Sequence, residues 1–202
     1  MKCTGPDCPE EPVVHIVEIR NRQFVPQVDL CETHAASHLP FSETGGGKTS
    51  LGTGLSDQVN RFELRFVVFF DNSEGDGVYL WEVAGTKRFS IPVRRYEAWS
   101  ILQALQKTIA TRPLTFTAFS MTIHSLGGKL EEVIVEELDG SGGFYHAKLK
   151  LRQQDNRQVV VDVRPSDAFA LAIACEVPIL IADRVLARAA ELGWTQGSSQ
   201  AS

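Results

Sequence analysis

Alternating apolar and polar stretches divide residues 58–202 into short predicted strands and helices. Segments rich in β-branched and aromatic residues, separated by glycine or aspartate clusters, predict strands at 61–70, 78–83 and 88–93. Apolar residues then recur at helical spacing, namely Ala98, Ile101, Leu102, Leu105 and Ile109. The order repeats with strands at 130–138, 144–152 and 158–163 and a helix at 166–175. Shorter helices are expected at 115–125 and 183–192.

The second set of elements resembles the first at an offset of 70 residues. Residues 93–105 align with 163–175, and the matched pairs include Val93/Val163, Arg94/Arg164 and Glu97/Asp167. Because the similarity extends through several elements, it indicates an internal duplication. Strands that occur in runs, rather than alternating with helices, favour an α+β fold over a doubly wound parallel sheet. The predicted fold class is α+β, with duplicated units of three strands and two helices.

The first 35 residues contain a candidate metal site. Four residues separate Cys3 from Cys8, and two residues separate Cys31 from His34. Zinc binds four ligands in a tetrahedron, and thiolates with an imidazole suit it. Segments 13–19 and 24–30 predict a hairpin between the two ligand pairs, and a segment this short buries little core without a metal. We therefore predict a zinc-knuckle module at 1–35 with structural zinc on Cys3, Cys8, Cys31 and His34.

Composition sets the remaining boundaries. Five glycines with several serines and threonines predict a flexible linker at 36–57, followed by a main domain at 58–195 and a disordered tail at 196–202.

The chain holds 20 Lys+Arg and 25 Asp+Glu, for a formal net charge of −5. This balance argues against a dedicated DNA-coating protein and leaves nucleic acid only a local basic patch. The sequence shows no transmembrane or secretory segment, so a cytoplasmic protein with reduced cysteines is expected.

A strand that runs into a helix at residues 161–172 is the most distinctive stretch. Pro165 pre-sets the turn, Ser166 is a candidate helix cap, and Asp167 suits the positive end of the helix dipole. Ordinary helix formation explains these three residues. It accounts less well for Arg164, whose counterpart in the first unit is Arg94, and for Asp162.

These residues resemble the signature of the bifunctional nuclease family, also called the DNase-RNase or DUF151 domain. The matching positions are Asp162, Arg164, Pro165, Ser166, Asp167, Ala168 and later Pro178 and Ile179. The resemblance implies a pair of three-strand, two-helix repeats around one barrel-like sheet, and hydrolysis of both DNA and RNA. Separately, the segment 30–35 (Leu-Cys-Glu-Thr-His-Ala) resembles the end of zinc-binding N-terminal modules in bacterial UvrB/UvrC-motif proteins.

Phosphodiester cleavage needs charge stabilisation on the phosphate and an activated water. Carboxylates that hold Mg²⁺ or Mn²⁺ supply both, and arginine adds a bidentate clamp. The candidate catalytic residues are Arg164, Asp167, Asp162, Ser166 and Glu97. Arg94 and Arg95 are candidate substrate-binding residues. His124 and His146 are further candidate bases.

Other interpretations remain open from the sequence. Arg164 and Asp167 can equally form a structural ion pair. The protein can be a non-catalytic regulatory or adaptor module whose zinc knuckle binds a protein partner. It can also bind a small anionic ligand at the helix start that follows Arg164. A homodimer is a further expectation, and no membrane partner is expected.

Overall fold

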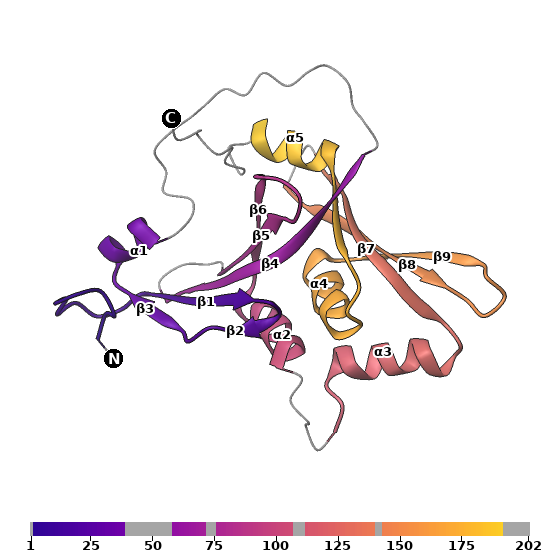
Figure 1. Cartoon of the computed structure of the whole chain (residues 1–202), viewed down its shortest axis with the longest axis horizontal. Helices are drawn as coiled ribbons and strands as arrows, with labels where there is room; N and C mark the ends of the chain where they lie inside the picture. Colours follow the sequence, from indigo (N-terminus) through magenta and orange to yellow (C-terminus); the bar gives the residue numbers. More distant parts are fainter. Residues whose placement is uncertain (1, 39–57, 72–75, 107–111, 140–142, 192–202) are drawn as a thin grey trace.

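The structure is a computed structural model that describes residues 2–38, 58–71, 76–106, 112–139 and 143–191. It has a mixed α+β fold with one large mixed sheet and, in those residues, five helices (Figure 1). The strands are β1 (Val14–Arg20), β2 (Gln23–Phe24), β3 (Val28–Leu30), β4 (Val59–Phe70), β5 (Asp76–Glu82), β6 (Arg88–Val93), β7 (Lys129–Leu138), β8 (Tyr145–Arg152), β9 (Gln158–Val163) and β10 (Ile179–Ala182). The helices are α1 (Glu32–His38), α2 (Arg95–Gln106), α3 (Thr115–Ser125), α4 (Pro165–Ala174) and α5 (Asp183–Glu191). No helix within these ranges is long and apolar enough to cross a membrane.

Strand β4 pairs with three other strands of the sheet. Its one edge pairs with β5, which pairs in turn with β6. Its other edge is shared by two strands: β10 pairs with Val59–Phe62 and β1 pairs with Phe66–Phe70. Strand β10 also runs parallel to β7 and so joins the first antiparallel three-strand set to the second, β7-β8-β9.

The sheet is open, and the expected barrel-like closure is wrong. Within the described chain, β6 pairs with β5 alone and β9 pairs with β8 alone. The two three-strand sets are connected through the short strand β10 in the middle instead of through their outer strands. Each set is followed by a helix, α2 or α4, in the order that the sequence predicts. Residue Ile109 of the predicted first helix lies outside the described residues.

Helices α2 and α4 pack against each other and against the sheet, where they form the main core. Almost every residue of α4 is buried, because its small and apolar side chains leave no polar face that needs water. Phe169 of α4 and Leu149 of β8 are both 0% exposed. This packing fixes where the two helices begin, which is where the candidate active site lies.

The N-terminal hairpin belongs to the same sheet. Val14 and Ile16 of β1 pack with the cysteines, whereas Val17 and Ile19 pack in the main core. Strand β1 therefore contributes to both clusters of buried residues, and the division of the chain into a module at 1–35 and a main domain at 58–195 stays a prediction. Residues 36–38 of the predicted linker continue helix α1, and residues 39–57 and the predicted tail 196–202 lie outside the described part of the chain.

Candidate active site and metal centre

Helices α2 and α4 begin side by side, and Arg164 connects their first turns. Arg164 is the N-cap residue of α4, with extended backbone angles of φ −71° and ψ 148°. Its Nε donates to Oδ2 of Asp167 at 2.9 Å and its Nη2 to Oδ1 at 3.2 Å, a bidentate pair. Its Nη1 donates to Oε1 of Glu97 in α2 at 2.7 Å. One guanidinium thus binds two carboxylates from the two halves of the domain.

The charges at this site differ in their access to solvent. The side chain of Arg164 is 59% exposed, that of Asp167 30% and that of Glu97 13%. The hydrogen bonds that Arg164 donates to Asp167, with further attraction from Glu97, hold the pKa of Arg164 above its ordinary value. Glu97 Oε2 also accepts the backbone N–H of Arg94 at 3.1 Å, half of a capping box at the start of α2. Glu97 is therefore fixed from two sides, while Arg164 faces solvent.

Two other predicted catalytic residues take different positions. Ser166 does not cap α4, because Arg164 is the N-cap residue and Pro165 begins the helix. The Ser166 side chain is buried, with 6% of the residue exposed. Asp162 is exposed on β9 opposite Lys148, and among the described residues no contact joins it to Arg164. His124 and His146 are exposed on α3 and β8.

The two candidate substrate-binding residues, Arg94 and Arg95, differ in their contacts with the rest of the protein. Arg94 is exposed, and its guanidinium makes no ion pair within the described residues. Arg95 reaches into the fold. Its Nε donates to Asp76 at 3.2 Å, and its Nη2 donates to the carbonyl of Phe70 at 2.7 Å. Arg95 therefore has a structural set of partners, whereas Arg94 is available to a ligand.

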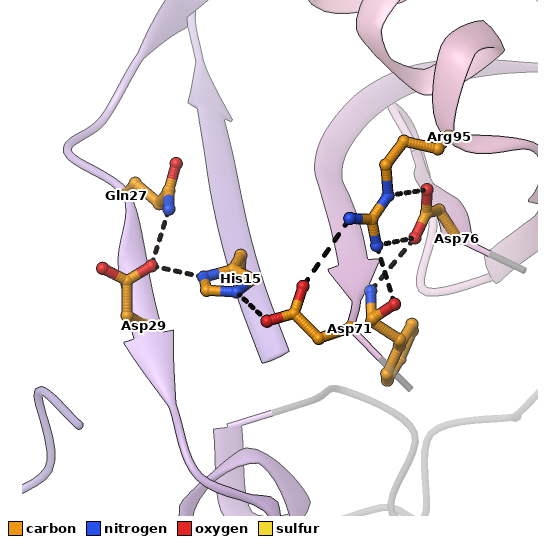
Figure 2. A network of polar contacts seen from close by, with 7 residues as sticks. His15, Gln27, Asp29, Asp71, Asp76 and Arg95 are labelled. Carbon is orange, nitrogen blue, oxygen red and sulfur yellow. Dashed lines mark hydrogen bonds and ion pairs between the residues drawn. The ribbon is translucent and has the colours of Figure 1, made fainter. Parts of the chain in front are cut away.

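Figure 2 shows that Arg95 belongs to a polar network between the hairpin and the main domain. His15 of β1 contacts Asp29 through Nδ1 at 2.7 Å and Asp71 through Nε2 at 3.0 Å. Asp71 in turn lies 3.6 Å from Nη1 of Arg95. Burial opposes protonation of His15, but the hydrogen bonds to Asp29 and Asp71 outweigh it and raise the pKa of His15. The network ties β1 to the start of α2.

Beside this network lies a cavity of about 640 Å³, within the size range of ordinary ligand pockets. His15, Asp71 and Arg95 supply its polar wall. Phe24, Phe69 and Trp99 supply part of its apolar wall. No sequence motif marks His15, Asp71 or Asp76 as site residues. The one available signal is that Asp71 and Asp76 flank the connection between two strongly predicted strands.

The four predicted zinc ligands come together near the start of β1, where Val14 packs with Cys3 and Cys31. The ligand atoms of Cys3, Cys8, Cys31 and His34 all lie within 4.8 Å of one another. Cys8 Sγ is 3.7 Å from Cys31 Sγ, and His34 Nδ1 is 3.2 Å from the same sulfur. A Cβ atom on Gly5 would lie 2.8 Å from the His34 ring, so only glycine lets the first ligand turn approach the histidine. This donor set fits a tetrahedral zinc site.

Backbone N–H groups favour the thiolate form of Cys3. Those of Cys31 and Gly5 point at Cys3 Sγ, at 3.3 and 3.4 Å. Burial raises the pKa of the Cys3 thiol, but the hydrogen bonds outweigh it and lower that pKa to about 7. Because metals bind thiolates, this environment suits a metal site. It is the only group of three or more Cys, His, Asp or Glu ligands that converges within the described ranges.

The fold is mixed α+β, with an exposed arginine between two carboxylates where α2 and α4 begin and a Cys₃His cluster near the start of β1. Residues 78–192, more than half of the chain, match the bifunctional nuclease domain, so the chain belongs to that family. The match begins at residue 78, so the resemblance of residues 1–35 to known zinc modules stays a prediction.

This chain is also similar to two curated proteins. They are the uncharacterized proteins MT1877 and Rv1829 of Mycobacterium tuberculosis, from strains CDC 1551 / Oshkosh and ATCC 25618 / H37Rv. Each is 34% identical to this chain over 110 residues, which is 54% of this chain and 63% of the relative. The chain thus spans less than two thirds of the relatives that it matches.

Proposed function

We propose that the protein is a nuclease that hydrolyses phosphodiester bonds in DNA or RNA at the paired starts of α2 and α4. Family membership supports the reaction class. The observation that carries the location is the contact of Arg164 with both Asp167 and Glu97 while 59% of its side chain faces solvent. A phosphate that approaches this site meets an exposed guanidinium and two N-terminal helix turns, all of which attract anions.

Arg164, Arg94, Glu97 and Asp167 each have a role in this proposal. Arg164 binds a non-bridging oxygen of the scissile phosphate, and Arg94, which has no ion pair in the described chain, binds the same or the next phosphate. Glu97 and Asp167 orient Arg164, and their carboxylate oxygens are the proposed ligands of a divalent metal ion. The matching positions of these residues in α2 and α4 also support the proposal that the two units are duplicates. Asp162 and Ser166 have no role in the proposed site, because one lies apart and the other is buried.

The carboxylates fit Mg²⁺ or Mn²⁺, which prefer oxygen ligands and commonly take one or two carboxylates plus phosphate oxygens. Such an ion would supply charge stabilisation and an activated water when bound. Both carboxylates contact Arg164, so we infer that Arg164 exchanges part of this contact for the substrate phosphate. The N-terminal cluster is a separate zinc site with a structural role.

The test measures cleavage rate and thermal stability on one variant. In Arg164→Ala the rate should fall on the order of a hundredfold, as when one preorganised donor is removed from an active site. Stability should change by only about 0–1 kcal/mol, because the ion pairs are partly exposed. Arg157→Ala is the matched control, since Arg157 is 68% exposed and has its own acidic neighbour, Asp155 at 3.9 Å. Full activity in a destabilised Arg164→Ala protein would show that this turn is structural.

One observation favours a second candidate, a non-catalytic zinc-containing adaptor or regulator. Arg164 is already neutralised by two carboxylates, and the cysteine cluster is the only convergent metal-ligand group in the described part of the chain. An adaptor would bind a protein partner or a small anionic ligand without hydrolysis. Wild-type protein that leaves both DNA and RNA intact with either Mg²⁺ or Mn²⁺ supplied would favour this candidate.

A further inference from the structure

The sheet has a gap along one edge of β4. Strand β10 covers that edge at Val59–Phe62, and β1 covers it at Phe66–Phe70. Among the described strands, neither pairs with residues 63–65 between them. A cleft of about 250 Å³ lies at this gap, between the turn after β1 and the segment that leads into β10.

A β-bulge at the gap changes the direction of the side chains. The pairing of β4 with β5 shifts between Leu64 and Phe66, so Arg65 is the extra residue of the bulge. Before the bulge Phe62 and Leu64 face the main core, whereas after it Val67 and Phe69 do. The bulge therefore frees Arg65 from the regular alternation and places it in the wall of the cleft.

The cleft is basic. Arg22, Arg61 and Arg65 line it, against the single carboxylate of Glu63. Within the described chain, none of the three arginines forms an ion pair, unlike Arg95, Arg152 and Arg164. The carboxyl ends of α2 and α4 lie nearby. Each carries about half a negative charge from the helix dipole, which repels an anion. Three guanidinium groups against one carboxylate outweigh this, so the cleft attracts anions.

Arg65 is held in place before any ligand binds. Its guanidinium carbon lies 4.7 Å from the centre of the Trp81 ring, and Arg88 stacks on the same ring at 4.8 Å. Its Nε is buried without a hydrogen-bond partner in the described residues. A stacked arginine loses little further freedom when it binds a planar or tetrahedral anion. A buried donor without a partner also gains a hydrogen bond from such a ligand.

We propose that this cleft binds the phosphate backbone of a single nucleic-acid strand, at a distance from the site where the strand is cut. The proposal rests on the proposed nuclease function, which favours phosphodiesters over other anions. Leu105 and Ile173, at the far ends of α2 and α4, line the cleft, whereas Arg164 and Glu97 lie at the near ends. Helix α4 has 10 residues, so the two places are separated by roughly 15 Å. A strand that reaches both spans about four to five nucleotides at the rise of about 3.4 Å per nucleotide of a stacked strand.

The test is binding of a fluorescein-labelled single-stranded DNA of about 12 nucleotides to the full chain, measured by anisotropy across a salt series without added Mg²⁺ or Mn²⁺. In Arg22→Gln/Arg61→Gln the affinity should fall on the order of tenfold, and the slope of log K against log salt should shrink by about 1.4, which is about 0.7 per lost phosphate contact. Lys129→Gln/Arg157→Gln is the charge-matched control, because neither residue lines the cleft.

Each outcome decides the proposal. Equal affinities and slopes in the cleft and control variants would overturn it. Displacement of the DNA by inorganic phosphate, or by poly-glutamate at the same ionic strength, would instead make the cleft a site for single phosphates or for acidic peptides. Gel analysis of the probe after each titration serves as the control that the DNA stays intact during binding. A protein that binds through the cleft yet never hydrolyses DNA or RNA would refute the proposed function and leave this inference standing.

Discussion

Replacing Asp76 by alanine tests whether the polar network beside the cavity fixes the start of α2. The Asp76 side chain is only 3% exposed. It accepts hydrogen bonds from the backbone N–H of Phe70 at 3.0 Å and from Nε and Nη2 of Arg95 at 3.2 and 3.3 Å. Asp76→Ala leaves the Phe70 N–H without its partner, but Arg95 keeps Asp71 and the Phe70 carbonyl. In this variant the Arg95 guanidinium therefore keeps acceptors and is not left as an isolated buried charge.

The expected loss of stability follows from those contacts. An unsatisfied buried donor costs about 1–3 kcal/mol, and the loss of charge-assisted bonds adds to it. The total, about 3 kcal/mol, is at the lower end of the cost of breaking a fully buried ion pair. At roughly 2–4 °C per kcal/mol, thermal unfolding followed by circular dichroism should shift down by about 6–12 °C. Asp155→Ala, at a carboxylate that is 65% exposed, should change stability by no more than about 0.5 kcal/mol. A midpoint for Asp76→Ala within about 2 °C of wild type would refute the reasoning.

Three further predictions concern the metal, the histidine and the core. Metal analysis should find about one zinc per chain, and the Cys31→Ala/His34→Ala variant should lose it; zinc retained undiminished there would remove the assignment. The pKa of His15 is raised in the fold, so its protonated form stabilises the protein fully below its unfolded value of about 6.5. That stabilisation should fade as the pH rises through the raised pKa, and denaturant titrations of His15→Gln should not show this fading. Phe169→Ala should cost about 3–5 kcal/mol, because Phe169 is 0% exposed; Phe144→Ala, 68% exposed, should cost little, and equal losses in the two variants would contradict the core assignment.

Local sequence signals predicted part of the candidate site well. The spacing of Cys3, Cys8, Cys31 and His34 predicted a group whose ligand atoms do converge. The Arg164–Asp167 contact is a local pair three residues apart, at a helix start that Pro165 marks. Glu97 could be added because its position matches Asp167 in the first unit, and Arg164 does contact it.

Contacts between distant segments could not be predicted in the same way. Nothing local distinguishes Arg94 from Arg95, and only the fold shows that Arg95 turns to Asp76, a residue at the start of another strand. The pairing of β1 with β4 joins segments about 50 residues apart, for which no local rule exists. One signal was present: apolar residues on both faces of β1, at Val14 and Ile16 and at Val17 and Ile19, favour a strand buried on both sides.

The central claim is that Arg164, Glu97 and Asp167 form the site of phosphodiester hydrolysis. The most direct measurement is a time course of cleavage of labelled single-stranded DNA and RNA by the full chain and by Glu97→Gln/Asp167→Asn, with Mg²⁺ or Mn²⁺ supplied or omitted. We predict cleavage by the wild type that depends on the added ion and is lost in the double variant, while circular dichroism shows both proteins folded. Uncut substrates with the wild type, or equal cleavage by a folded double variant, would contradict the account.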